Sequence, residues 1–226
     1  MTISAFPPVD DADEDGLLCV GGDLEVDSLL LAYRSGIFPW PVSTDCPLVW
    51  FAPPTRAVLF LDQVHISRSL MRARERSGFT FSIDSQCENV IRNCARSKNR
   101  GKQRGTWIIP QMIKAYSALH RAGWCHSVEC LDGDRLVGGL YGVSIGDMFA
   151  GESMFYLEPN ASKLALWHLI THLQERNVPW LDCQQLTPLL ASFGAVEIPR
   201  KQFMGLLGEA VTTGRNLFSP TIQKNL

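Results

Sequence analysis

The sequence of 226 residues lacks the features that would place it in a membrane or in an oxidising compartment. No apolar run reaches the roughly 18 residues that a membrane-spanning helix needs. Residues 1–15 show no basic region followed by an apolar core, so no secretory signal is expected. The seven cysteines are odd in number and form no C-x-x-C pair, which is typical of reduced, buried thiols. A cytoplasmic protein without membrane contact is therefore expected.

Positive charge is missing from one end of the chain and concentrated in the middle. Residues 1–27 hold eight acidic residues and no Lys or Arg, whereas residues 56–104 hold eleven Lys or Arg and four acidic residues. Such clusters usually form solvated faces, but two of them in a chain of formal net charge -2 favour a polyanion partner, with tRNA or another RNA as the natural candidate. The first cluster has helical i, i+4, i+8 spacing and the second lies in a predicted loop: Arg68, Arg72 and Arg76, then Lys98, Arg100, Lys102 and Arg104.

The pattern of apolar residues predicts an α+β fold with two domains. Residues 1–62 are expected to form a small, loop-rich N-terminal domain, and residues 63–226 a catalytic domain. The order of elements in the second domain is that of a GNAT-like acyltransferase core, with a mixed, mainly antiparallel sheet flanked by helices. The predicted elements are helix 67–77, strand 79–83, helices 88–95 and 110–122, strands 125–131, 136–143 and 148–153, helix 161–176, a strand from Trp180, and helices 187–193 and 200–209.

The segment before the long helix argues against coenzyme A as the acyl donor. GNAT enzymes that use acetyl-coenzyme A bind its pyrophosphate on backbone N–H groups of a glycine-rich loop at this position. Residues 155–163 contain no glycine, Pro159 has no N–H group, and Glu158 would repel phosphate. Another activated acyl donor is therefore expected, and the basic clusters favour one carried on RNA.

Three polar residues could perform chemistry. Asp182 and Gln184 alternate at the end of a predicted strand and so share a face, where a carboxylate and an amide can orient a third polar group. From these residues alone a strand end that frays into solvent is the more common interpretation. Glu152 lies in an apolar segment, where it could bind an amino group or form a cross-strand salt bridge, and the sequence leaves both open.

The sequence offers no strong metal or nucleophile motif. His168 and His172 have the i, i+4 spacing of metal ligands on a helix, but no third ligand is evident and no metal site is predicted. No G-x-S-x-G elbow is present, and the cysteines have no assigned base.

Separate sequence blocks resemble those of one family, the bacterial leucyl/phenylalanyl-tRNA–protein transferases. They follow one another in order across about residues 16–200, and so many matches in sequence are improbable by chance. Two of them read Y-R-S-G-I-F-P-W and L-V-G-G-L-Y-G-V. The blocks are residues 21–24, 33–40, 65–69, 105–108, 136–143, 151–155, 160–163, 182–184, 192–195 and 197–200.

The resemblance implies that Leu or Phe, with Met as a further candidate, passes from aminoacyl-tRNA to the N-terminal α-amine of a protein that begins with Arg or Lys. This reaction marks the acceptor for degradation by the N-end rule. No cofactor is implied, because the tRNA ester is already activated and the protein has mainly to position the reactants. A monomer is the default expectation.

The resemblance also implies roles for particular residues. Asp182 and Gln184 are expected to form the catalytic pair, with Asp182 setting the direction of the Gln184 amide so that its oxygen aligns the attacking amine. Glu152 is expected to contact the donor amino group. Trp40 and Trp107 are expected near the 3′-terminal adenosine, although core packing is the better interpretation of both without the resemblance. The amino-acid side chain is expected in a pocket of Leu140, Phe149, Phe155, Leu169, Leu173 and Leu181.

Two alternatives remain open. An aminoacyl-tRNA-dependent transferase with another acceptor, such as a peptidoglycan ligase, would keep the fold, although those enzymes commonly carry two such domains. A non-catalytic RNA-binding module would use the basic clusters but would leave Glu152, Asp182 and Gln184 without a role.

Overall fold

The computed structural model describes residues 2–41, 46–97 and 108–218. The N-terminal part forms a three-stranded sheet in the order β1-β3-β2, so it is more ordered than the loop-rich unit that the sequence predicts. Its elements are η1 (Val9–Asp11), β1 (Leu17–Val20), α1 (Val26–Arg34), β2 (Phe38–Pro39) and β3 (Val49–Phe51).

The remaining strands form a seven-stranded sheet in the order β10-β4-β9-β8-β7-β6-β5. Only the β8–β9 pair is parallel among the described strands, so the predicted α+β fold with a mixed, mainly antiparallel sheet flanked by helices is confirmed. The strands are β4 (Thr55–Phe60), β5 (Thr80–Ile83), β6 (Cys125–Asp132), β7 (Arg135–Ile145), β8 (Met148–Tyr156), β9 (Trp180–Gln184) and β10 (Val196–Pro199), and the helices are α2 (Arg68–Ser77), α3 (Cys87–Arg96), α4 (Pro110–Arg121), α5 (Ala161–Gln174), α6 (Pro188–Ser192) and α7 (Arg200–Val211).

The boundary between the predicted domains stays a prediction. Strand β4 lies before residue 62, yet it pairs with β9 on one side and β10 on the other, inside the large sheet. We therefore propose a boundary between β3 and β4. Strand β10 was not predicted, because it has four residues of which only Ile198 is buried, and so short a run carries a weak signal.

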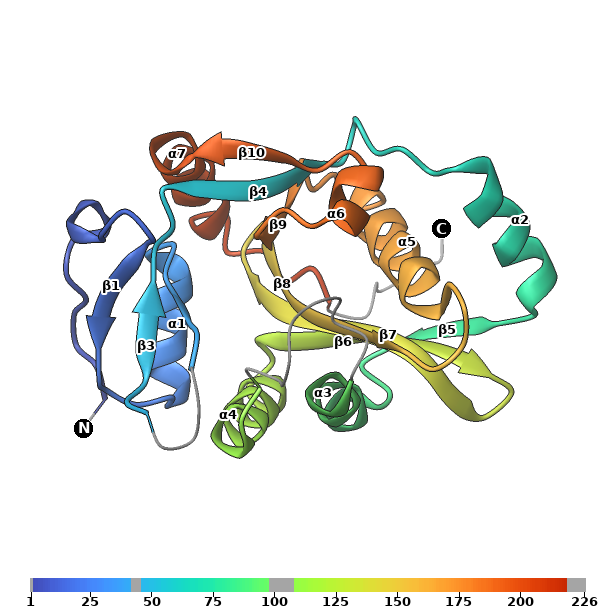
Figure 1. Ribbon diagram of the computed structural model, residues 1–226, viewed down its shortest axis with the longest axis horizontal. Coiled ribbons are helices and arrows are strands. Elements are labelled where there is room, and N and C mark those ends of the chain that lie inside the picture. The colour runs from blue at the N-terminus through green and yellow to red at the C-terminus, as the bar shows by residue number, and fades with distance from the viewer. Residues whose placement is uncertain (1, 42–45, 98–107, 219–226) are drawn as a thin grey trace, which may run out of the picture.

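Helices cover both faces of the large sheet, with α3 and α4 on one face and α5 on the other (Figure 1). Apolar side chains of α3 and α4 form one core cluster with α1 and the N-terminal strands. Those of α5 form a second cluster with the opposite face of β6 to β9. Among the described residues, no helix combines the length and the apolar character that a membrane span requires.

The parallel pair is the feature that makes room for a site. β8 and β9 share a single paired position, Ala150 with Asp182. Beyond this position β8 continues to Tyr156 and β9 to Gln184 without further pairing to each other, so the sheet opens between them.

Candidate active site

A cavity of about 580 Å³ lies where β8 and β9 separate. One end is apolar and lies between α5 and the sheet, and the other end is polar, an arrangement typical of small-ligand sites. The apolar lining includes Leu140, Phe149, Met154, Leu166, Leu169 and Leu181, and the polar lining includes Glu152, Asp182 and Gln184.

Four of the six residues predicted for the pocket, Leu140, Phe149, Leu169 and Leu181, line this cavity, and two do not. Phe155 is buried in the other core cluster, on the α3 and α4 face of the sheet. Glu152 is the extra residue of a β-bulge, because Tyr141 pairs with Ser153 while Gly142 pairs with Gly151. The bulge reverses the alternation of β8, so Met154 lines the cavity in place of Phe155.

Leu173 also lies away from the cavity. It is one turn beyond Leu169 on α5 and is fully buried in the core cluster between that helix and the sheet. Helical spacing places both residues on one face, but the cavity reaches only the turn that carries Leu169.

Glu152 receives three hydrogen bonds from neutral side chains and forms no salt bridge with a described residue. Oε1 accepts from the Tyr33 hydroxyl at 2.7 Å and from Gln184 Nε2 at 2.6 Å, and Oε2 accepts from the Tyr116 hydroxyl at 2.9 Å. Burial raises the pKa of Glu152 to about 7, although the two tyrosine hydrogen bonds favour its ionised form. The carboxyl therefore changes charge near neutral pH.

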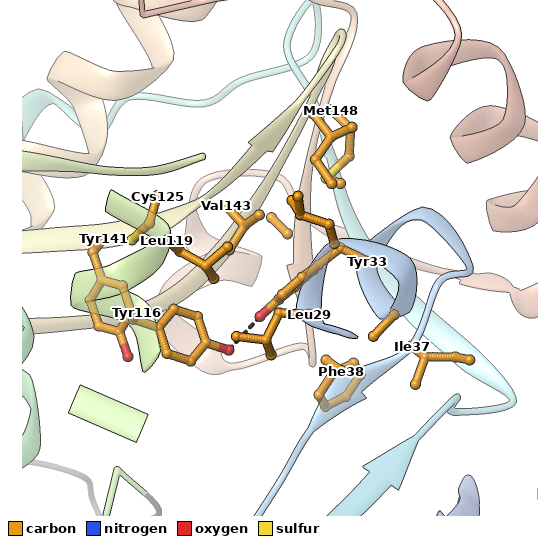
Figure 2. Close-up of a cluster of buried hydrophobic side chains, with 14 of the residues drawn as sticks. Leu29, Tyr33, Ile37, Phe38, Tyr116, Leu119, Cys125, Tyr141, Val143 and Met148 are labelled. Carbon is orange, nitrogen blue, oxygen red and sulfur yellow. Dashed lines mark hydrogen bonds between the residues drawn. The ribbon is translucent and has the colours of Figure 1, made fainter. Parts of the chain in front are cut away.

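Two buried tyrosines hold this carboxyl from the face of the sheet that α3 and α4 cover. Figure 2 shows Tyr33 of α1 and Tyr116 of α4 with their hydroxyls joined by a hydrogen bond of 2.5 Å. Burial, followed by the nearby Glu152 carboxylate, raises the pKa of each hydroxyl well above its usual value. Both tyrosines thus remain protonated. Their two hydroxyl hydrogens serve two of the three short contacts with Glu152 and with each other, and a hydrogen for the third is present only when the Glu152 carboxyl is protonated.

Gln184 has an unusual backbone conformation that directs its side chain to Glu152. Its φ is 58°, in the left-handed region that residues other than glycine rarely adopt. The backbone N–H of Gln184 donates to Asp182 Oδ1 at 2.9 Å, which supports this turn of the chain. The amide is oriented by Glu152 and not by Asp182 as the sequence suggested, because Nε2 donates to Glu152 and leaves Oε1 for another partner.

Asp182 is instead held by Arg56, a residue that the sequence analysis did not identify. Arg56 of β4 donates from Nε and Nη2 to the two carboxylate oxygens of Asp182 at 2.9 and 2.7 Å, and both side chains are buried. The guanidinium packs on the rings of Phe38 and Phe203, 4.7 and 4.6 Å from their centroids, and Nη1 donates to the Gly36 carbonyl at 3.2 Å. The only sequence signal for this role is an arginine at the start of an otherwise apolar run, residues 56–60.

The residues predicted to bind tRNA fall into two groups. Trp40 is partly exposed and lines the cavity, and Arg68, Arg72 and Arg76 are exposed on α2, whose first turn is capped by Ser67. The other predicted positions lie outside the described residues: Lys98, Arg100, Lys102, Arg104 and Trp107.

One group of described side chains could hold a metal ion. Ligand atoms of Asp84, Cys87 and His120 lie within 4.8 Å of one another. However, Asp84 Oδ2 already bonds His126 Nδ1 at 2.6 Å, and His120 Nδ1 faces the Cys125 carbonyl at 2.8 Å. These bonds favour a structural role for the group.

His168 and His172 also have structural surroundings. The His168 ring stacks on Phe81, with centroids 5.2 Å apart, and the His172 ring stacks on Phe218, with centroids 4.9 Å apart. Their helical spacing therefore reflects packing against aromatic side chains.

Sequence comparisons assign this fold and site to an aminoacyltransferase. A family model described as "Leucyl/phenylalanyl-tRNA protein transferase" matches residues 58–208, and a model of the N-terminal domain of the same family matches residues 22–54. The chain belongs to the leucyl/phenylalanyl-tRNA–protein transferase family.

Two relatives of similar sequence support this assignment. A leucyl/phenylalanyl-tRNA–protein transferase of Maridesulfovibrio salexigens is 48% identical over 91% of this chain and 85% of its own length. One of the same name from Anaeromyxobacter sp. strain Fw109-5 is 48% identical over 92% and 87%. Among solved structures, L-PGS from Bacillus licheniformis gives a TM-score of 0.44 at 14% identity, covering 84% of this chain and 71% of its own.

Proposed function

We propose that the cavity binds the aminoacyl end of Leu-tRNA or Phe-tRNA, with Met-tRNA as a further donor, and transfers the amino acid to the N-terminal α-amine of a protein that begins with Arg or Lys. The observation that carries this proposal is an apolar cavity that ends at the Glu152 carboxyl and the oriented Gln184 amide. An apolar amino acid matches the two ends of this cavity, because its hydrocarbon side chain suits the apolar end and its amino group suits the polar end.

The apolar end would hold the side chain of the donor amino acid. Leu140, Leu169 and Leu181 surround this space, and Phe149 closes it. A pocket of this kind discriminates Leu from Ile by shape, typically by only about 1–3 kcal/mol per misplaced methylene-sized group.

The polar end would hold the two amino groups. The ionised Glu152 carboxylate can accept a hydrogen bond from the donor ammonium at Oε2, since Oε1 already accepts two hydrogen bonds and Oε2 only one. Gln184 Oε1 would accept a hydrogen bond from the attacking amine, because Nε2 is committed to Glu152. An amide oxygen is a very weak base, so Gln184 aligns the amine and does not abstract its proton.

The reaction itself is a single acyl transfer. The acceptor nitrogen forms a bond to the ester carbonyl carbon, the bond from that carbon to the 3′-oxygen of the tRNA breaks, and one proton moves from the nitrogen to this oxygen. Asp182 and Arg56 lie behind Gln184 and would act by holding its backbone in the left-handed conformation. Preorganisation of this kind lowers the entropic part of the barrier.

The remaining parts of the proposal concern the tRNA and the setting of the reaction. Trp40 would stack on the 3′-terminal adenosine at the cavity, where stacking is worth about 1–3 kcal/mol per base. The exposed arginines of α2 would contact tRNA phosphates. We further propose that the protein acts as a monomer in the cytoplasm, in degradation by the N-end rule.

A transfer assay tests the proposal. Labelled Leu-tRNA or Phe-tRNA is mixed with matched peptides that begin with Arg, Lys or Ala. Label is expected on the first two peptides and not on the third. Binding of tRNA without transfer would support a non-catalytic RNA-binding protein, and transfer to the peptide that begins with Ala would support another acceptor.

A further inference from the structure

A second, smaller cavity of about 240 Å³ lies between α3 and α4, on the opposite face of the sheet from α5. The two helices pack side by side along this groove (Figure 1). None of the residues that line it belongs to the candidate active site. The lining consists of Glu88, Arg92, Pro110, Ile113, Lys114, Ser117 and Arg121.

The groove is positively charged. It contains three cationic side chains, Arg92, Lys114 and Arg121, and one carboxylate, Glu88. Arg92 is neutralised in part, because its Nε donates to Glu88 at 3.1 Å. Lys114 and Arg121 are exposed and have no carboxylate partner among the described residues. The groove therefore has a net charge of two positive units available to an anion.

Ser117 provides a second, independent observation. Its side chain is only 7% exposed and lines the groove, and its hydroxyl oxygen has no hydrogen-bond partner among the described residues. A buried hydroxyl without a partner is uncommon, because leaving it unpaired costs free energy. The oxygen itself exposes less than 1 Å², so a rotation of the Ser117 side chain would be needed for it to donate to an anion held by the cations of the groove.

The position of the groove suits the donor RNA. Ser97, at the end of α3, lines the candidate active site, and Arg92 lies five residues earlier on the same helix. At 1.5 Å per residue this is about 7–8 Å along the axis, which is comparable with about two nucleotides of a nucleic-acid strand. A strand whose last sugar enters the large cavity would pass the groove with one of its phosphates.

We propose that the groove between α3 and α4 binds a backbone phosphate of the tRNA acceptor end, through Lys114, Arg121 and the Ser117 hydroxyl. The inference rests on the proposed function, since that function supplies the RNA. An acidic stretch of the acceptor protein is the other polyanion to consider. The nearness of Arg92 to the aminoacyl cavity favours RNA.

The test compares two donors and three variants. The donors are Phe-tRNA and 3′-O-phenylalanyl-adenosine, which has no phosphate. The variants are Lys114→Gln, Ser117→Ala and the control Lys201→Gln, which removes one exposed lysine from α7. Affinity for Phe-tRNA is measured across a series of salt concentrations, and transfer is measured with both donors.

Lys114→Gln is expected to weaken Phe-tRNA binding several-fold and to lower the slope of log K against log salt by about 0.7–0.9, the value for one lost phosphate contact. Ser117→Ala is expected to weaken binding without changing the slope, because the hydroxyl is uncharged. Lys201→Gln is expected to change neither. The loss of transfer activity in Lys114→Gln should appear with Phe-tRNA and not with the phosphate-free donor.

Three outcomes would overturn the inference. Equal effects of Lys114→Gln and Lys201→Gln on the slope would show that only general charge matters. An effect of Lys114→Gln on the KM of the acceptor alone would assign the groove to the acceptor protein. An equal loss with both donors would show that no phosphate is bound there. Failure of the wild-type protein to transfer from either donor would instead refute the proposed function, because the slope comparison does not require transfer.

Discussion

Arg56 holds both carboxylate oxygens of Asp182 in a buried ion pair that joins β4 to the end of β9. The pair lies directly behind Gln184, whose backbone N–H shares Asp182 Oδ1 with the guanidinium. A buried ion pair of this kind orients its neighbours, because each buried charge is stable only when its counter-charge and hydrogen-bond partners are correctly placed.

Replacement of Arg56 by Met is expected to lower the free energy of unfolding by about 3–5 kcal/mol, since it leaves Asp182 buried without a counter-charge. Urea denaturation measures this. Arg56→Lys keeps the charge but loses the two-pronged contact, so it should fold and show a lower kcat with a nearly unchanged KM for the donor. A normal kcat in Arg56→Lys would show that the pair does not position Gln184.

Two substitutions distinguish the effect of the Gln184 backbone conformation on stability from the effect of its side chain on activity. Gln184→Gly and Gln184→Ala both remove the amide, and both are expected to lose most transfer activity. Because glycine adopts a φ of 58° without strain, the Gly variant should be more stable than the Ala variant by about 1 kcal/mol. Thermal or urea unfolding of the two proteins provides the comparison, and near-full activity of the Ala variant would remove Gln184 from the mechanism.

The raised pKa of Glu152 predicts how stability depends on pH. Its pKa is about 7 in the folded protein and near 4.5 when the chain is unfolded, so the folded state binds the extra proton between these values. Stability is therefore expected to fall as pH rises from about 5 to 8, by on the order of 2 kcal/mol after allowance for partial exposure of the carboxyl. Glu152→Gln should reduce this change in the free energy of unfolding, measured by urea denaturation at about pH 5 and pH 8. A pH dependence equal to that of the wild type would contradict the assignment.

The tyrosine contacts predict a shift in the pH profile of catalysis. If ionised Glu152 binds the donor ammonium as proposed, kcat/KM for the donor should rise with pH through about 7. Tyr33→Phe removes a donor that favours the ionised form, and the rise should move to higher pH. Tyr141→Phe is the matched control, because the Tyr141 hydroxyl has no hydrogen-bond partner among the described residues. Equal profiles in the two variants would contradict the role of Tyr33.

The shape of the cavity predicts which residue sets donor preference. Leu169→Phe fills the apolar end and is expected to lower kcat/KM for Phe-tRNA relative to Leu-tRNA by about 10-fold or more. Competition between the two charged tRNAs for one acceptor peptide measures the ratio. Leu173→Met changes a neighbouring residue that does not line the cavity, and it should leave the ratio unaltered. A shift of similar size in that control would mean that general packing of α5 sets the preference.

Most elements of the large sheet could be predicted from the sequence because their signals are local. Turn residues separate β6, β7 and β8, and helix α2 begins at the Ser67 cap and ends at Gly78 in the left-handed conformation. The bulge at Glu152 could not be predicted in this way, because one inserted residue reverses the facing of Phe155 and Met154 and leaves no mark in the apolar pattern.

The sequence by itself determined the family and most helices and strands of the large sheet, since these depend on residue identity and local spacing. Through the family resemblance it also singled out Glu152, Asp182 and Gln184 as candidate site residues. Only the tertiary structure decided which partner each polar group has. Arg56 is 126 positions from Asp182, and Tyr33 is 119 from Glu152, so their contacts exist only after β4, α1 and the sheet have packed. Hydrogen-bond geometry and burial are properties of that packing, which is why the orientation of the Gln184 amide and the pKa of Glu152 could be read only from the folded protein.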